Sequence, residues 1–287
     1  LDVGGCTGVE LRDLTFTGGG ERTARIAGSD HVRLDHVDIQ ASTYGLVIQN
    51  SRDVAVWHTR LDGGMPPWSF RSDFKDDYAL VLPDGGSERD NLVRKTSRAL
   101  LWIGGDVQRL EVAYSELAHA HDVYFAGHDS ELHHSWIHDI HDEALFLGHT
   151  DDSGDLRVHD NLFERFLSGI AGTAKKITGP RYLFRNVFDL REPIAGIRPG
   201  GNATGVWRYG APFKSVGRSP TYFYLNTVLL ARAGNQAAAP FFRTLDKDGT
   251  AHAARWFAGN VIAVATHAGN DKTLAFVPDD SYRAARR

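Results

Sequence analysis

The chain has few of the features that define several large classes of protein. Cys6 is the single cysteine among 287 residues, so no disulfide can form within the chain. No apolar run approaches the length of a membrane-spanning helix, and no membrane span is expected. The formal net charge of −4 gives no electrostatic reason to expect a nucleic-acid partner.

A targeting segment is also missing from the sequence as it stands. The chain begins at Leu1 and starts within a repeat, so its N-terminus is expected to be truncated or processed. Export from the cell, either secreted or periplasmic, is expected only through the function inferred below.

A short motif recurs along the chain: an apolar residue, two variable residues, a small or polar residue, a variable residue and a second apolar residue. Where no insertion intervenes, successive copies begin 20 to 26 residues apart. This period is too short for a propeller blade and lacks the helical half of a βα repeat, and it is typical of a β-solenoid. The copies are Val56–Leu61, Val112–Leu117, Leu132–Ile137, Val158–Phe163, Leu183–Phe188, Phe223–Val228 and Phe257–Ile262, with looser copies at Leu11–Phe16 and Leu34–Ile39.

A second apolar segment precedes many copies of the motif, separated from it by turn residues. Two strands per coil predict an all-β fold, a right-handed parallel β-helix of about ten coils. We expect one domain over residues 1–287, with longer and less regular coils at 189–287. The second segments are Gly45–Ile48, Ala99–Ile103, Val123–Ala126, Ala144–Leu147 and Gly169–Ala171.

Asparagine occupies the polar position in the last four copies of the motif: Asn161, Asn186, Asn226 and Asn260. An amide stacked in a turn can bond its own backbone and the amides above and below, so four in register favour an asparagine ladder. Asparagine also prefers turns for local reasons, which explains one such residue better than four.

A β-sandwich is the competing fold, because it too uses many short strands. It does not account for a recurring six-residue motif, and the hairpin signals that it requires are scarce in this sequence.

An insertion at residues 62–76 joins two coils and carries Trp68. Insertions in solenoids emerge on one face, often the binding face, where an indole ring can stack on sugar rings. A hydrophobic plug is an equally good interpretation of the same residues.

A basic stretch, residues 175–218, begins with Lys175 and has only two acidic residues. It is either a trough for an anionic chain or a solvated edge that balances the acidic centre of the molecule.

Acidic and histidine side chains gather at the starts of the second strands in the central coils. Neighbouring strands lie ~4.8 Å apart, so Asp122 is expected beside Asp142 and Glu143 on the next coil. Carboxylates this close raise the pKa of one member of the pair, which supplies the acid and the base of a glycosidase. Expected catalytic residues are therefore Asp122, Asp142, Glu143 and His121, and expected substrate-binding residues are Arg98, Tyr124, Trp68, Lys175 and Asp77.

No cofactor is required by this interpretation. The spacing of His138, His141 and Asp142 matches no familiar zinc signature. Calcium is a weak alternative at Asp122, Asp142 and Glu143, whose oxygens are the hard ligands that it prefers. It favours a lyase, in which His121, Tyr124, Lys175 or Arg98 removes the proton at C5 of a uronate.

The repeated motif and its asparagines resemble the right-handed parallel β-helix superfamily of polysaccharide lyases, glycoside hydrolases and uronan epimerases, also called the pectin-lyase-like fold. The pectin-hydrolysing branch has an acid on one coil and an acidic pair on the next. Asp122 and the pair Asp142 and Glu143 match these features, with Glu in place of the second Asp. The branch's later Gly-His-Gly and Arg-x-Lys are not matched, since the next coil has Ser168–Ile170.

Three functions remain open from the sequence. The leading hypothesis is a glycoside hydrolase that uses paired carboxylates on adjacent coils and takes a polysaccharide or oligosaccharide substrate. The alternatives are a polysaccharide lyase acting on an anionic, uronic-acid polymer, and a non-catalytic carbohydrate-binding or adhesive β-helix. The sequence leaves the sugar, the linkage and the oligomeric state undetermined.

Overall fold

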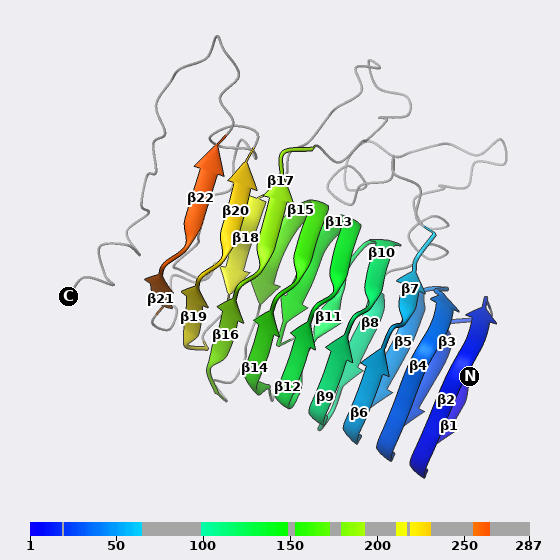
Figure 1. The fold of residues 1–287 in the computed structure, drawn as a ribbon. Helices are drawn as coiled ribbons and strands as arrows, with labels where there is room; N and C mark the ends of the chain where they lie inside the picture. The colour runs from blue at the N-terminus through cyan, green and yellow to red at the C-terminus, as the bar shows by residue number, and fades with distance from the viewer. Residues whose placement is uncertain are drawn as a thin grey trace, which may run out of the picture.

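The chain folds as a parallel β-helix whose coils stack along one axis, from the N-terminal coil in blue to the last described coil in orange (Figure 1). Neighbouring strands pair in parallel, as in Asp2–Gly4 (β1) with Arg22–Ala27 (β3). None of the described residues forms a helix long and apolar enough to cross a membrane. The computed structural model describes residues 1–18, 20–64, 99–148, 153–172, 179–192, 211–216, 219–230 and 255–264.

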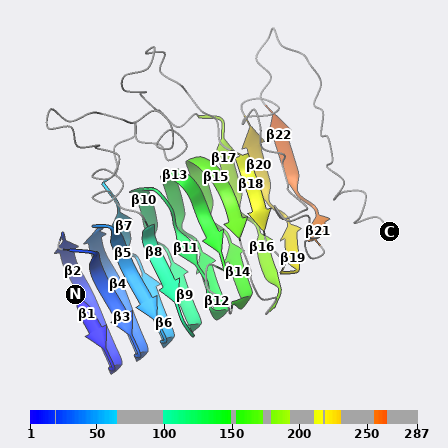
Figure 2. The same cartoon turned by 180° about the vertical axis from the view of Figure 1, so that it is seen from behind.

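Strands of successive coils stack into three columns, seen from both sides in Figures 1 and 2. The first column contains β1, β3, Tyr44–Gln49 (β5), Ala99–Gly104 (β8), Tyr124–Phe125 (β11) and Ala211–Val216 (β18). The second contains Arg52–Trp57 (β6), Gln108–Ala113 (β9), His128–His133 (β12), Gly154–His159 (β14), Arg181–Phe184 (β16), Thr221–Tyr224 (β19) and Arg255–Ala258 (β21). The third contains Arg60–Asp62 (β7), Glu116–Ala120 (β10), Val187–Leu190 (β17), Thr227–Leu230 (β20) and Val261–Val264 (β22).

Four long strands each belong to two columns. Thr7–Thr17 (β2) and Asp30–Gln40 (β4) run through the second and third columns. Trp136–Leu147 (β13) and Leu162–Gly172 (β15) run from the third column into the first. The corner between the third and first columns is therefore made of continuous strand in these two coils.

Apolar residues at alternate positions point inward and stack coil upon coil into one core. Alternation along a strand sends successive side chains to opposite faces, so each motif places its apolar residues on the inside. Phe163 and Phe188 stack in this core with ring centroids 4.8 Å apart. One fully buried column consists of Leu34, Val56, Val112, Leu132, Val158 and Leu183.

Polar side chains form a ladder at the turn between the second and third columns. In the first coils the rungs are hydroxyls: Thr59 N donates to Ser115 Oγ at 3.1 Å, and Ser115 N donates to Ser135 Oγ at 3.2 Å. Ser135 N then donates to Asn161 Oδ1 at 3.0 Å, and from there the rungs are asparagines. The amide groups of Asn161, Asn186, Asn226 and Asn260 bond one another in sequence at 3.0–3.1 Å.

The residue before each rung has a left-handed backbone. Its φ lies between 48° and 62° in successive coils, a conformation that is uncommon outside glycine. Because the turn is the same in each coil, these residues line up on the outside of the molecule. Asp13 and His36 have the same conformation at the corresponding places of the first two coils, where Leu14 and Val37 replace a polar rung. We call the whole set the left-handed column: Asp13, His36, His58, Tyr114, His134, Asp160, Arg185, Leu225 and Gly259.

Two details differ from the sequence-based expectations. Asp62 is the last residue of β7, so the insertion begins after it. Aligning the apolar runs of the second segments predicts Arg98 beside Tyr44 and Asp122, whereas in the structure Ala99 pairs with both of them. The motif locates the strands, but the length of each turn shifts the register by one residue.

We predict that Asn186→Ala destabilises the chain by about 3 kcal/mol, because several buried polar groups lose their partner at once. Asn186 is fully buried, donates to Val158 O and Asn226 Oδ1, and accepts from the Asn161 amides. Urea unfolding followed by circular dichroism measures the change. Asn260→Ala, at the partly buried end of the ladder, is the comparison and should cost less; equal costs would contradict the ladder's role.

Candidate functional site

The candidate site lies at the corner where β13 turns from the third column into the first. The pairing of β13 with β15 shifts register between Ile140 and Glu143, so β13 carries one extra residue there. Such a bulge redirects side chains, and bulges are over-represented next to active sites. The predicted residues Asp142 and Glu143 lie in this bulge, and His121 and Asp122 lie at the same corner of the preceding coil.

Asp122 is the buried centre of the site, with 1% of its side chain exposed. Its Oδ2 lies 2.6 Å from His121 Nδ1 and accepts a hydrogen bond from the Tyr124 hydroxyl at 3.0 Å. Its Oδ1 accepts from the Glu143 backbone N–H at 3.1 Å. The carboxylate therefore connects two consecutive coils and has donors at both oxygens.

The Asp122 carboxyl is ionised over the physiological range. Burial alone raises its pKa, but the charge and hydrogen bond of His121, followed by the hydrogen bonds from Glu143, lower the pKa to about 2. The sequence analysis expects close carboxylates to raise the pKa of one acid, but the pKa of Asp122 is lowered. A carboxyl of this kind holds a neighbour in place and is a poor proton donor at neutral pH.

His121 is the group of this pair that a substrate can reach. Its side chain is 15% exposed, whereas Asp122 lies beneath it. Because Asp122 is ionised, His121 donates its Nδ1 proton to that carboxylate, and Nε2 is the ring nitrogen that is not bonded to Asp122. A partly exposed imidazole bonded to a buried carboxylate is also the geometry of the His-Asp pair in Ser-His-Asp hydrolases.

The other two predicted acids lie beside this pair. One ligand atom each of His121, Asp122 and Asp142 lies within 4.8 Å of the others. Asp142 is 6% exposed and Glu143 is 3% exposed. The structure thus brings together the four residues predicted to be catalytic, but it buries all three of the acids.

Tyr124, predicted to bind substrate, lies at the same site on β11. Besides its bond to Asp122, its ring packs against Phe146 with centroids 5.2 Å apart. Both rings are partly exposed. The site therefore presents a hydroxyl and an aromatic surface together with the imidazole.

Calcium does not fit this donor set well. The ion prefers six to eight oxygen ligands. Both Asp122 oxygens already accept hydrogen bonds, and the third member of the group is the imidazole of His121. We derive no step of the reaction through this ion.

A second cluster follows along β13, and sequence reasoning did not find it. His119, His138 and Asp139 bring ligand atoms within 4.8 Å of one another, so His138 does not group with Asp142 as a zinc site would require. Arg165 binds Asp139 through two hydrogen bonds of 2.9 Å. The pKa of Asp139 is lowered, because the bonds from His138 and Arg165 outweigh its burial.

A groove of about 380 Å³ continues from Arg165. His119, Asp139 and Arg165 lie at the same place in three successive coils and each has a left-handed backbone. His141 lies on β13 between Asp139 of this cluster and Asp142 of the first. Burial, and then the nearby His121 charge, lower its pKa to about 3. The groove is lined by Glu164, Arg165, Asp189, Arg191 and Glu192.

The basic stretch contributes less positive surface than its composition indicates. Arg181 is completely buried, and burial lowers its pKa to about 10. Arg185 binds Asp160 and Arg191 binds Asp189 at 2.6 Å. Of the predicted substrate-binding residues, Arg98, Trp68, Lys175 and Asp77 lie outside the described residues.

Seven chains among solved structures match this chain, and the two named next have low sequence identity to it. The tailspike gp61 of Pseudomonas phage phi297 has 10% identity and a TM-score of 0.48, over 94% of this chain and 47% of that chain. Pectate lyase Bsp165PelA from Bacillus sp. N165, solved in complex with trigalacturonate, has 12% identity and a TM-score of 0.38, over 96% and 74%. The chain spans about half the length of the tailspike. No protein-family model and no curated protein matches it.

We predict that Asp122→Asn lowers the free energy of unfolding at pH 7 by about 2 kcal/mol, from the difference between 3.8 and about 2 in the pKa. A lowered folded-state pKa gives stability that is present above the unfolded pKa and is lost as the pH falls through the folded pKa. The native chain should therefore lose this stability between about pH 4 and pH 2.

Urea unfolding at several pH values measures this difference. The Asp122→Asn variant should approach the native chain in stability near pH 2. Asp38→Asn, at an exposed position of β4, is the control. A constant gap between Asp122→Asn and the native chain at all pH values would show that the aspartate charge is not what stabilises the site.

Proposed function

We propose that the chain is a carbohydrate-active enzyme that cleaves a polysaccharide at the corner site around His121. The observation that carries the proposal is the pair of partly exposed proton-transfer groups, His121 and Tyr124, held by one buried and ionised carboxylate. A binding module does not need a charged residue buried at such cost, whereas acid–base chemistry needs an oriented base.

The geometry supports β-elimination on a uronic-acid chain better than hydrolysis. Hydrolysis through paired carboxyls requires one acid that is protonated near neutral pH and reaches the glycosidic oxygen. Asp122 meets neither condition, since it is ionised and 1% exposed. Elimination requires a base and an acid on accessible groups, which His121 and Tyr124 supply. In this proposal we therefore place elimination ahead of the hydrolysis that the sequence analysis favoured.

Each residue then has a defined role. Nε2 of His121 removes the proton at C5 of the uronate, and the electrons form the C4–C5 double bond as the C4–oxygen bond breaks. The Tyr124 hydroxyl protonates the departing oxygen. Proton transfer from His121 to the tyrosine oxygen restores both groups, which are bonded to the same Asp122 oxygen. Asp122 is a positioning residue throughout.

The groove beside Arg165 supplies a place for the rest of the chain. Its lining is entirely charged, with three acidic residues and two arginines, and such groups can bond the hydroxyl groups of a sugar polymer. Arg165 at the groove binds Asp139 on β13, the strand that also carries Asp142 and Glu143 of the corner site. A polymeric substrate of this kind is met outside the cell, so we include export in the proposal.

Hydrolysis by Asp142 and Glu143 is the second candidate. It is favoured by the way Asp122 brings the other two acids together: one oxygen of Asp142 lies within 4.8 Å of one of Asp122, and the Glu143 backbone N–H bonds Asp122. In that reaction Asp142 and Glu143 divide the roles of acid and base, and His121 binds a sugar hydroxyl.

Incubation with plant, algal and bacterial uronic-acid polysaccharides tests the proposal. Elimination yields an unsaturated product that absorbs in the ultraviolet, together with new reducing ends. Reducing ends without that absorption would establish the hydrolytic candidate, and neither signal on the whole panel would leave a binding module.

We predict that His121→Gln lowers kcat for the unsaturated product at least about a hundredfold, the usual contribution of a general base. Tyr124→Phe should also lower kcat, because the departing oxygen loses its proton donor. His58→Gln is the matched control: His58 also bonds an aspartate, Asp35, at 2.9 Å, but in another coil far along the chain. Full activity in His121→Gln would end the proposal. Equal losses of activity in His121→Gln and His58→Gln would point to a general effect on folding.

We further predict that the calcium chelator EGTA leaves the rate of product formation unchanged within about twofold, because the donor set does not suit calcium. The rate is measured by ultraviolet absorbance before and after chelation, with calcium added back in excess. A loss that calcium restores would show that the ion takes part and would overturn the assignment of roles given above.

A further inference from the structure

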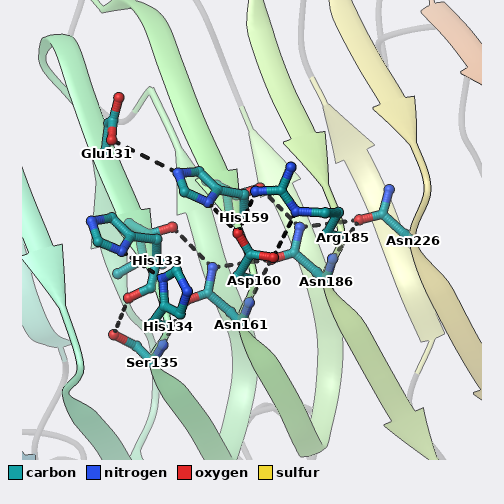
Figure 3. A network of polar contacts seen from close by, with 12 residues as sticks. Glu131, His133, His134, Ser135, His159, Asp160, Asn161, Arg185, Asn186 and Asn226 are labelled. Carbon is teal, nitrogen blue, oxygen red and sulfur yellow. Dashed lines mark hydrogen bonds and ion pairs between the residues drawn. The ribbon is translucent and has the colours of Figure 1, made fainter.

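Trp136 is an exposed aromatic residue at the start of β13, on the outer face of the third column. It directly follows Ser135, a rung of the polar ladder whose backbone N–H donates to Asn161 Oδ1 on the next coil (Figure 3). The backbone N–H of Trp136 itself donates to Ser115 O on the preceding coil at 2.9 Å. The backbone that carries the indole is therefore held by both neighbouring coils.

Two side-chain contacts fix the indole ring. Trp136 and His138 point to the same side of β13 because they are two residues apart, and their rings stack with centroids 3.7 Å apart and 26° between the planes. The indole Nε1–H donates to Glu164 Oε2 on the next coil at 2.7 Å. A ligand that stacks on this ring does not have to order it first. We call the indole with His138 and Glu164 the Trp136 platform.

The face of the indole opposite His138 is turned to solvent. His138 points outward from its strand and is nevertheless only 4% exposed, so the indole covers it. Trp136 remains 39% exposed with one face covered in this way, so its exposed area lies on the other face and the outer edges. A fixed aromatic face of this kind attracts the C–H groups on the flat side of a sugar ring, because the face carries partial negative charge.

Acidic side chains surround the platform. Glu164 accepts the indole N–H, and Glu116, which pairs with Trp136 in register, lies 3.2 Å from His138 Nε2. Two nearby arginines each pair with one of these glutamates and also with a second carboxylate, so acids outnumber bases here. A uronate carboxylate is repelled by such surroundings, whereas sugar hydroxyls can donate hydrogen bonds to them. The platform therefore suits a neutral sugar.

The platform and the corner site lie on one strand. β13 runs from Trp136 to the bulge with Asp142, and six residues of extended strand span at most about 20 Å. Glu164 of the platform also lines the groove, and it pairs in register with His138, between the two ends. A single sugar cannot bridge the platform and the corner site, but several linked sugars can.

We propose that the Trp136 platform binds a neutral sugar ring of the polysaccharide, remote from the bond that is cleaved at the corner site. Only the mention of cleavage rests on the proposed function, since the platform binds its sugar with or without it. The substrate class is then a polymer in which neutral sugars accompany uronates. A short uronate oligomer fills the corner site alone and gains nothing from Trp136.

Electrophoresis of the full chain through native gels that contain polysaccharide tests the proposal. Xanthan and gum arabic combine neutral sugars with uronates, and polygalacturonate consists of uronates. We expect at least one of the two mixed polymers to retard the native chain. Trp136→Leu should weaken that binding about tenfold, because leucine still covers His138 but has no aromatic face.

Trp256→Leu is the matched control. Trp256 is the other exposed tryptophan among the described residues, with 45% exposure, and it stacks on Tyr222 at 4.3 Å in the second column. Its variant should be retarded as the native chain is. Trp136→Phe keeps a ring over His138 and should bind more tightly than Trp136→Leu, and the melting of each variant by circular dichroism verifies its fold.

The outcomes separate this site from the corner site. Native-like retardation of Trp136→Leu in the mixed gels, or no retardation of the native chain in any gel, would overturn the proposal. An equal loss of binding to polygalacturonate would overturn the selection of a neutral sugar. His121→Gln should be retarded as the native chain is, and retardation without cleavage by the native chain would end the proposed reaction while supporting the Trp136 platform.

Discussion

Parallel hydrogen bonding between successive coils is the interaction on which the whole molecule depends. It stacks the same turn of each coil in register. A side chain that bonds the backbone polar groups of that turn in one coil can therefore do so in every coil. The ladder from Thr59 to Asn260 shows the result, because each rung accepts the backbone N–H of the rung before it. Hydroxyls serve in the first coils, and asparagines, which add a second donor, serve in the later ones.

The corner site arises where this regularity breaks. One extra residue in β13 moves Asp142 and Glu143 out of simple register, and Asp122 fills the resulting position with bonds to both coils. A buried carboxylate is costly unless all its oxygens are satisfied. Here His121, Tyr124 and a backbone N–H donate hydrogen bonds to the carboxylate, and these bonds also fix the positions of the two side chains. The same contacts that make the charge tolerable therefore orient the groups proposed to move protons.

Repetition explains how much of this could be predicted from the sequence. The motif located the strands and the stacked asparagines, because these depend on contacts that recur. It also brought Asp122 near Asp142 and Glu143. The bulge, the burial of these acids and the pairing of Asp139 with Arg165 depend on the length of individual turns, which the repeat does not encode. The burial of Arg181 was not predicted either. Its charge indicated an exposed side chain, but it pairs with Leu156 at an inward-facing position of its strand.

The left-handed column separates backbone shape from surface chemistry. Histidine, tyrosine, aspartate, arginine, leucine and glycine all occupy the same backbone conformation in successive coils. A substitution in this column changes the exposed side chain and leaves the backbone of the turn unchanged, provided that the new residue tolerates a left-handed conformation. The outer edge of the helix is thus a row of positions at which the exposed side chain can differ from coil to coil while the backbone stays the same.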